Sequence, residues 1–200
     1  MALYFQCYVY CFAIGAMSVV VGAVLYCFIH GYHIYNKKTY TMIRKATRND
    51  YKAVWEIFSQ VIATGDTYVF SPDTAEKDIQ EHWFADYMNT FVFEENGKIL
   101  GTYIIKPNQI DLGNHIANCS YMVHPNAQGK GIGRQLCEHS LKFAKENNFL
   151  AIQFNIVVST NKSAVELWKK YGFKIIGTTP NGFRHSTLGL VDTYIMYKPL

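Results

Sequence analysis

The stretch Tyr121–Ser140, YMVHPNAQGKGIGRQLCEHS, decides the fold of this chain. It predicts an apolar strand, a turn at His124, a loop containing Gly129, Gly131 and Gly133, and then a helix whose apolar residues recur at helical spacing. A glycine-rich loop that opens a helix leaves several backbone N–H groups unpaired at the positive end of the helix dipole. The stretch therefore predicts a binding site for a phosphate or pyrophosphate group.

Two common phosphate-binding loops do not fit this stretch. A Walker loop would end in Gly-Lys followed by Ser or Thr, and that ending is missing. The dinucleotide-binding fingerprint would need a third glycine where Leu136 stands. The pattern that remains is Gln128-x-x-Gly131-x-Gly133. Taken alone, this pattern is also compatible with a tight strand-to-helix turn that binds no ligand.

A second pattern, NKSAVELWKKYGF at residues 161–173, lies downstream. It predicts a helix that begins at Thr160 or Asn161 and stops at Gly172. Four residues at helical spacing form the face that packs against a sheet: Ala164, Leu167, Trp168 and Tyr171.

In this order, with a strand between them, the two patterns resemble the acyl-CoA-binding elements of the GNAT superfamily of N-acetyltransferases. The resemblance spans about residues 42–200. It implies an α/β domain with a mixed, mostly antiparallel central sheet, a splayed parallel strand pair and flanking helices. It also implies acetyl-CoA as co-substrate, with no metal. The residues that it assigns to CoA are Met122, Val123, Gln128, Gly129, Lys130, Gly131, Ile132, Gly133, Arg134, Asn161 and Trp168.

Residues 1–36 are an apolar segment without Asp, Glu, Lys or Arg. A helix over residues 3–29 would be about 40 Å long, enough to cross a hydrocarbon core of about 30 Å. The first charges, Lys37 and Lys38, follow the segment, which places the domain on the cytoplasmic side of a membrane. The alternative is that the native protein starts at Met42. The sequence leaves both interpretations open.

The remaining chain alternates strand and helix signals. Strands are expected at residues 41–45, 90–94, 98–106, 115–123, 150–158, 174–178 and 191–197, with a type I′ turn at Asn96-Gly97. Residues 115–123 and 150–158 are expected to run parallel, because a helix connects them. A capped helix is expected after Thr47-x-x-Asp50, and a short one from Pro72 to about Tyr87. Residues 180–185 are expected to be a loop.

Two asparagines stand out in the central strands, Asn118 and Asn155. Asparagine is depleted in strands, and a buried amide needs hydrogen-bond partners. A pair in adjacent strands favours a shared polar pocket over two structural amides. Together with residues 153–157 and Asn161, they resemble the azetidine-2-carboxylate (proline-analogue) N-acetyltransferases and their bacterial relatives. That resemblance implies that Asn118 and Asn155 bind the acceptor and the reacting groups, while Asn161 binds CoA or only caps its helix.

The sequence offers no clear general acid or base. Many members of the superfamily carry a tyrosine acid where Trp168 stands, and an indole cannot serve as one. Tyr121 or Tyr171 could replace it, with core packing as the alternative role. We therefore expect Asn118, Asn155 and Tyr121 to serve the reaction, and Asp66 and Tyr68 to contact the acceptor. The amine would attack directly and lose its proton to water.

The leading hypothesis is an acetyl-CoA-dependent N-acetyltransferase of a small amino-acid-like amine. The alternatives are acetylation of a protein amine and a membrane-tethered, non-catalytic acyl-CoA-binding module. The five cysteines show no paired or metal-binding spacing, which fits a reducing compartment. The formal charge of +4 is not gathered into a basic stripe, so nucleic acid is not an expected partner. A homodimer is a further possible assembly of this chain.

Overall fold

A computed structural model describes residues 40–200. The apolar segment at residues 1–36 and the anchor expected over residues 3–29 lie outside the described residues. Between residues 40 and 200, no helix is both long and apolar enough to span a bilayer.

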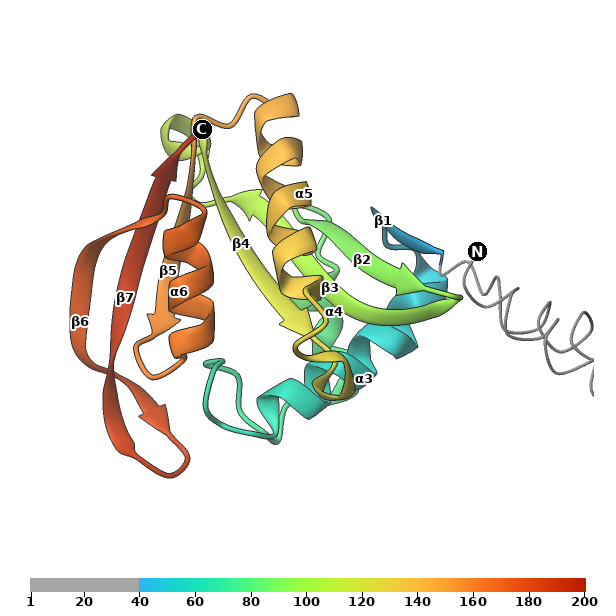
Figure 1. The fold of residues 1–200 in the computed structure, drawn as a ribbon, viewed down its shortest axis with the longest axis horizontal. Helices are drawn as coiled ribbons and strands as arrows, with labels where there is room; N and C mark the ends of the chain where they lie inside the picture. The colour runs from blue at the N-terminus through green and yellow to red at the C-terminus, as the bar shows by residue number, and fades with distance from the viewer. Residues whose placement is uncertain (1–39) are drawn as a thin grey trace, which may run out of the picture. The chain divides into compact units, whose positions relative to one another are not determined.

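Within residues 40–200, seven strands form one sheet in the order β1-β2-β3-β4-β5-β7-β6 (Figure 1). All neighbours in this sheet are antiparallel except β4 and β5, which are parallel, as the sequence predicts. The strands are β1 (Thr41–Lys45), β2 (Asn89–Glu95), β3 (Lys98–Pro107), β4 (Ile116–Val123), β5 (Ala151–Val158), β6 (Lys174–His185) and β7 (Gly189–Pro199).

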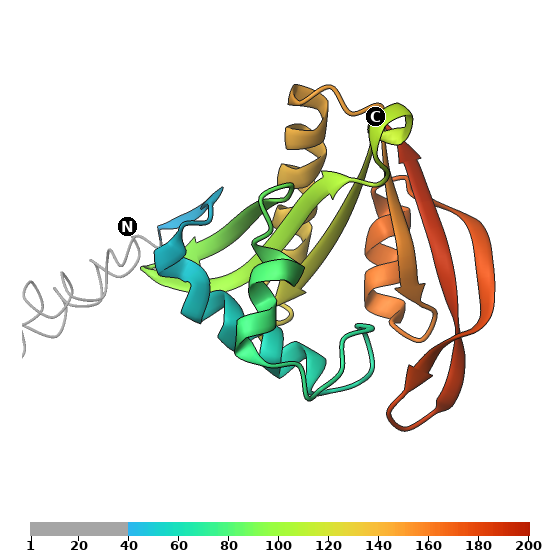
Figure 2. The same ribbon diagram turned by 180° about the vertical axis from the view of Figure 1, so that it is seen from behind.

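Helices cover both faces of the sheet. Helices α5 (Ile132–Glu146) and α6 (Lys162–Lys170) lie in front of the sheet in Figure 1. Helices α3 (Tyr51–Ile62) and α4 (Ile79–Trp83) lie on the opposite face, which Figure 2 shows. Short 3-10 turns occur at Arg48–Asp50, Glu76–Asp78, Asp111–Gly113 and Pro125–Ala127.

The two faces bury separate cores because strand side chains alternate between them. On β4, Ala117 and Cys119 belong to the core under α5 and α6, whereas Met122 belongs to the core under α3 and α4. Ile104 of β3 also belongs to this second core. Helices α3 and α4 leave the β5, β6 and β7 side of their face uncovered (Figure 2). Part of one sheet face is therefore available for a ligand.

Two predicted elements differ from the structure. The helix expected from Pro72 to about Tyr87 is helical only as a 3-10 turn followed by α4, Ile79–Trp83. Before it, Thr74 donates through both its backbone N–H and its hydroxyl to the Ser71 carbonyl, which makes a turn. After it, Phe84 leaves helical geometry with φ −129° and ends the helix.

The loop expected at residues 180–185 belongs to β6. The strand continues through an irregular register between Thr179 and Phe183. Asn181, at φ 53°, donates its backbone N–H to the Asp192 carboxylate at 2.9 Å, and the Phe183 side chain is buried. A side-chain acceptor and an apolar anchor thus keep a Pro-Asn-Gly segment in the strand. The β6–β7 turn lies instead at residues 186–188.

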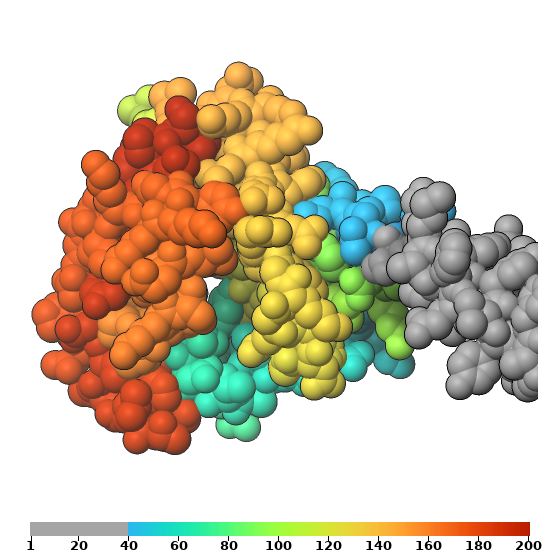
Figure 3. Space-filling model, in the orientation of Figure 1, coloured from blue at the N-terminus to red at the C-terminus, as the bar shows by residue number. Residues whose placement is uncertain are grey.

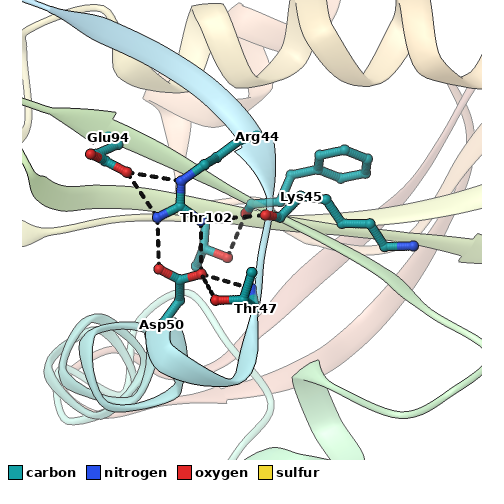
Figure 4. A network of polar contacts seen from close by, with 7 residues as sticks. Arg44, Lys45, Thr47, Asp50, Glu94 and Thr102 are labelled. Carbon is teal, nitrogen blue, oxygen red and sulfur yellow. Dashed lines mark hydrogen bonds and ion pairs between the residues drawn. The ribbon is translucent and has the colours of Figure 1, made fainter.

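Arg44 joins the first strand to the second and to the turn before α3 (Figure 4). Its guanidinium donates to both carboxylate oxygens of Asp50 at 2.8 Å and to Glu94 at 2.8 Å. Asp50 also accepts from the backbone N–H and the hydroxyl of Thr47, which completes the predicted cap. The hydrogen bonds from Arg44 are the main reason that the pKa of Asp50 falls from 3.8 to about 2.

This network predicts an acid-dependent loss of stability. Because the pKa of Asp50 is lower in the folded chain than in the unfolded one, its contribution of about 2 kcal/mol is present above about pH 4. It disappears as the pH falls towards 2. Urea unfolding of the full chain should show that Asp50→Asn is less stable than the wild type at pH 6, with the difference shrinking below pH 4. The exposed Asp73→Asn should show no such difference at any pH.

Candidate active site

The sheet opens between its two parallel strands. Strands β4 and β5 pair only at Ile116 with Ala151 and at Ala117 with Ile152. Beyond these pairs the two strands diverge towards the ends nearer α3 (Figure 1). Figure 3 shows the surface hollowed between the yellow loop before α5 and the orange region of α6. The gap between β4 and β5 is the predicted splayed strand pair.

The backbone of β4 presents hydrogen-bonding groups to this gap. On β4, His124 N–H donates to Leu100 and the Ile116 carbonyl accepts from Asn108, so the even-numbered residues pair with β3. Since the pairing direction alternates along a strand, the N–H and C=O groups of Cys119, Tyr121 and Val123 point towards β5. Beyond Ala117 no strand is there to receive them. The gap is therefore a strand-shaped slot with one hydrogen-bonding edge.

Asn118 lies where this gap begins. In a continuing parallel ladder the Gln153 carbonyl would accept from the N–H of Cys119. Instead the Asn118 side-chain amide donates to the Gln153 carbonyl, with 2.9 Å between Nδ2 and the oxygen. Asn118 thus satisfies the last carbonyl before the strands part. It is half-buried, and its amide keeps a second N–H for another acceptor.

Asn155 is connected to Asn118 through Gln153 rather than directly. The Gln153 side chain donates to Asn155 Oδ1 at 2.9 Å, and Asn155 Nδ2 donates to Asn108 Oδ1 at 2.8 Å. The expectation of a buried amide is wrong for Asn155, whose side chain is exposed. The reason is that Asn155 faces the side of β5 that α3 and α4 leave uncovered (Figure 2).

The glycine loop lies at the end of β4 and opens onto solvent. Gly129 and Gly131 adopt φ 78° and 76°, the left-handed region that favours glycine. A Cβ added at Gly129 would meet nothing within 4 Å, and one at Gly131 only the Arg134 guanidinium at 4.0 Å. No side chain of residues 40–200 caps α5, so its first N–H groups are available to a ligand. Lys130 and Arg134 are exposed beside them.

Three residues that the resemblance assigns to CoA have their side-chain positions turned inward. Ile132 is buried and lies close to Gly101, where an added Cβ would meet it at 2.8 Å. A Cβ at Gly133 would face Leu167 and Val123 of the core at 3.8 and 3.9 Å. The Met122 side chain is buried in the core under α3 and α4. Ile132 and Gly133 can therefore reach a ligand only through their backbone.

Helix α6 lies on the α5 side of the gap. Asn161 is its N-cap, since Asn161 Oδ1 accepts from Ala164 N–H at 3.2 Å, while its contact with CoA stays a prediction. Trp168 is buried between the two diverging strands, with its ring 4.8 Å from Tyr121 and 4.9 Å from Phe154 between centroids. The Trp168 indole thus bridges β4 and β5 on the α6 side of the sheet.

The Tyr121 phenol points to the α5 side, away from Asn118 and Asn155. Its hydroxyl bonds with Ser140 Oγ at 2.7 Å, and Ser140 donates in turn to the Cys137 carbonyl at 2.8 Å. The Tyr121 hydroxyl is therefore the donor to Ser140. Burial raises the pKa of Tyr121 well above its usual range. The structure does not bring the Tyr121 hydroxyl together with the two asparagines.

The two cysteines of the described chain are buried on the same side. Burial is the main cause that raises the pKa of Cys119 and of Cys137 to about 12. At neutral pH both are therefore thiols, and neither is suited to carry an acyl group as a nucleophile.

The loop between α3 and α4 reaches the other side of the gap. The Tyr68 hydroxyl donates to the Tyr121 carbonyl at 2.5 Å, which is one of the groups facing the gap. Asp66 accepts from the Thr64 hydroxyl. The same loop contacts the β6–β7 turn, where Ser186 donates to the Gly65 and Thr64 carbonyls at 2.9 and 2.8 Å. The loop therefore connects the two halves of the sheet across the opening.

Two members of this site were not predicted from sequence. Gln153 links Asn118 to Asn155, and Asn108, just after β3, holds the Asn155 amide. Gln153 carried a signal, since it is a polar residue two positions before Asn155 in a buried strand. Asn108 carried none, because only the fold brings residue 108 near residue 155.

The comparison with protein families decides the assignment. The model of the acetyltransferase (GNAT) family matches residues 51–173. This range includes β4, β5, the glycine loop, α5 and α6. The chain belongs to the acetyltransferase (GNAT) family. GNAT proteins are acyltransferases, and the GNAT part of the predicted identity is thereby confirmed.

Individual relatives agree with the family assignment. The chain is 31% identical to N-acetyltransferase aca1 of Schizosaccharomyces pombe, over 82% of this chain and 73% of the relative. It is 28% identical to the L-amino acid N-acyltransferase MnaT of Escherichia coli, over 69% of this chain and 82% of MnaT.

Solved structures show the same fold. A GCN5-related N-acetyltransferase from Kribbella flavida superposes with a TM-score of 0.77 and 36% identity, covering 80% of this chain and 98% of the other. The structure of yncA from Salmonella typhimurium with its cofactor acetyl-CoA gives a TM-score of 0.71 at 22% identity, covering 80% of this chain and 94% of that one.

Proposed function

We propose that this GNAT protein transfers an acetyl group from acetyl-CoA to the amine of a small amino-acid-like acceptor. One observation carries the proposal. The open glycine loop with its uncapped helix start lies at the end of β4, where β4 has parted from β5. A phosphate-binding end and a strand-shaped slot thus adjoin each other, which suits a diphosphate joined to an extended thioester arm.

Two groups of residues fit coenzyme A: the glycine loop fits its diphosphate, and the edge of β4 fits its amide-containing arm. The backbone of Gln128–Arg134 would hold the diphosphate, with the Lys130 and Arg134 side chains adding positive charge. The Tyr121 N–H and the backbone groups of Val123 would pair with the amide-containing arm, because the Tyr121 carbonyl already accepts from Tyr68. Asn161 still has its side-chain NH₂ free for CoA while it caps α6. Acetyl-CoA is bound by the neighbour yncA, which has the same fold.

The acceptor would lie on the sheet face that carries Asn118 and Asn155. There the contact between the α3–α4 loop and the β6–β7 turn favours a small acceptor over an extended protein segment. Asp66 and Tyr68 belong to this loop and remain the expected contacts. The name of the relative MnaT, an L-amino acid N-acyltransferase, supports the same acceptor class. The more specific azetidine-2-carboxylate assignment belongs to this proposal as well.

The chemistry requires only direct attack. The neutral amine nitrogen forms a bond to the acetyl carbon, the carbon–sulfur bond breaks, the amine proton passes to water, and CoA leaves as a thiol after taking up a proton. Asn118 and Asn155 cannot accept a proton at neutral pH and would orient the reacting groups. Tyr121 is held by Ser140, so we assign it to packing beside the slot.

Turnover by the purified full chain tests this proposal. With acetyl-CoA and a panel of amines, we expect free CoA to be released fastest with azetidine-2-carboxylate or another small amino acid. Binding of CoA is measured beside turnover. Binding without turnover on any amine would favour the non-catalytic acyl-CoA-binding alternative, and turnover only on protein amines would favour the second alternative.

Three further predictions on the setting of the enzyme stay predictions. The membrane anchor over residues 3–29, and with it a catalytic domain facing the cytoplasm, concerns residues outside the described range. A start at Met42 in the native protein is the alternative, which the mass of the native protein would distinguish. The homodimer likewise remains a proposal, to be checked by the mass of the protein in solution.

A further inference from the structure

Lys106 lies on the acceptor face of the sheet, directly beside Asn118. The two residues are opposite each other in the antiparallel register of β3 and β4. Opposed residues carry their side chains on the same face, with Cβ atoms about 5 Å apart. Ile104, two residues earlier on β3, is buried under α3 and α4 on this face. Lys106 therefore projects on the same side, at the end of β3 that adjoins the amides.

Within residues 40–200, the Lys106 ammonium has no carboxylate partner. Between residues 40 and 200 the basic groups in ion pairs are Arg44, His124, Lys142 and Lys169. The Lys106 ammonium lies over the Tyr87 ring, 5.4 Å from Nζ to the ring centroid. Lys106 is also half-buried, and this burial lowers its pKa. A partly desolvated cation without a counter-ion is suited to an anionic ligand.

Two neutral amides on the same sheet face as Lys106 have unused N–H groups. Asn118 uses one N–H of its amide on the Gln153 carbonyl and keeps the second. Asn155 uses one N–H on Asn108 and likewise keeps the second. No carboxylate takes part in this row of amides. An ammonium and amide N–H donors on one sheet face can together recognise a small carboxylate.

We propose that Lys106 binds the carboxylate of the acceptor and makes a free carboxylate beside the amine a requirement for good substrates. This inference rests on the proposed function. It narrows the acceptor class to amino and imino acids, because amines without a carboxylate would leave the cation unpaired. The Tyr87 ring, just before β2, makes a cation–π contact with this ammonium.

The test compares an acid with its amide. In the full chain, Lys106→Gln should raise the KM for azetidine-2-carboxylate, or for the best amino acid of the amine panel, about 10- to 100-fold. The KM for the corresponding carboxamide should stay within about 3-fold, since the carboxamide carries no charge to lose. The KM for acetyl-CoA should also stay unchanged. Lys106→Arg should restore most of the preference for the acid, because it keeps the charge.

A matched control lies on the same strand. Lys98 begins β3 at the far end, is exposed, and has no ion pair in the described chain. Lys98→Gln removes the same charge and should change no KM. If Lys106→Gln lowers turnover of acid and carboxamide equally, or of neither, the Lys106 assignment is overturned while the proposed function stands. A wild-type chain that acetylates no amine overturns both.

Discussion

Replacing Gly131 by alanine should raise the KM for acetyl-CoA about 100-fold. A Cβ at this position points into open space, 4.0 Å from its nearest neighbour, the Arg134 guanidinium. In our proposal that space receives the diphosphate. The methyl group would keep the phosphate oxygens from the first amides of α5, and losing two charge-assisted hydrogen bonds costs about 3 kcal/mol. Steady-state kinetics at saturating acceptor and direct titration with CoA both measure the effect.

Alanine at Gly131 also strains the backbone, because φ is 76° there. Gly97 provides a matched control, since it has φ 78° and nothing within 4 Å of an added Cβ. It lies in the β2–β3 turn, so Gly97→Ala imposes similar strain, about 1 kcal/mol, away from the loop. We expect both variants to lose similar stability and only Gly131→Ala to lose affinity for CoA. Equal CoA affinity in the two variants would exclude Gly131 from the binding site.

Most of the fold could be predicted because its signals are local. The Asn96-Gly97 turn has positive φ at both residues, as a type I′ turn requires, and it joins β2 to β3 where expected. The Asn161 cap of α6 also follows from a short-range rule, whereas α5 begins at Ile132 and so includes Gly133, which was expected in the loop. The turn and the cap depend on neighbours within about four residues, which a sequence displays directly.

The errors arise where distant residues override local preference. The sequence of residues 180–182 predicts a loop. In the structure, Asp192 on the next strand accepts a hydrogen bond from the Asn181 N–H, and the buried Phe183 side chain anchors the continuation of β6. The helix expected up to Tyr87 ends at Trp83. There the Trp83 indole donates to Thr102 of β3 at 2.9 Å, so tertiary contacts fix the last turn.

The residues of the site also fall into those that local sequence patterns predict and those that only the tertiary structure reveals. The glycine loop and the position of Asn118 at the splay could be predicted, because a motif and a strand locate them. The exposure of Asn155 could not, since it depends on which part of the sheet face α3 and α4 leave uncovered. Lys106 carried no signal either: a lysine near the end of a strand is ordinary until the register places it opposite Asn118.

Replacing Asn118 by alanine should lower kcat/KM for the acceptor about 100-fold and leave the KM for acetyl-CoA within about 3-fold. We expect this loss of activity because of where the Asn118 amide lies. The Asn118 amide stands between the last paired residues and the open gap, and its second N–H is directed to no group of the described chain. Removing it deprives the acceptor of a donor and leaves the Gln153 carbonyl unpaired, which loosens the position of Asn155. Two interactions with the reacting groups are then weakened at once, for about 3 kcal/mol in total.

A loss of folding could imitate this result, so the control must remove an equivalent hydrogen bond elsewhere. Asn147 donates its side-chain amide to the Phe143 carbonyl at 2.8 Å, as Asn118 does to Gln153, but at the far end of α5. Asn147→Ala should therefore cost about 1 kcal/mol of stability or less, with kinetics like those of the wild type. The decisive comparison is between the two variants at a temperature where both are folded. If Asn118→Ala then acetylates the acceptor as fast as Asn147→Ala, the asparagine serves the sheet alone, and the acceptor must bind elsewhere.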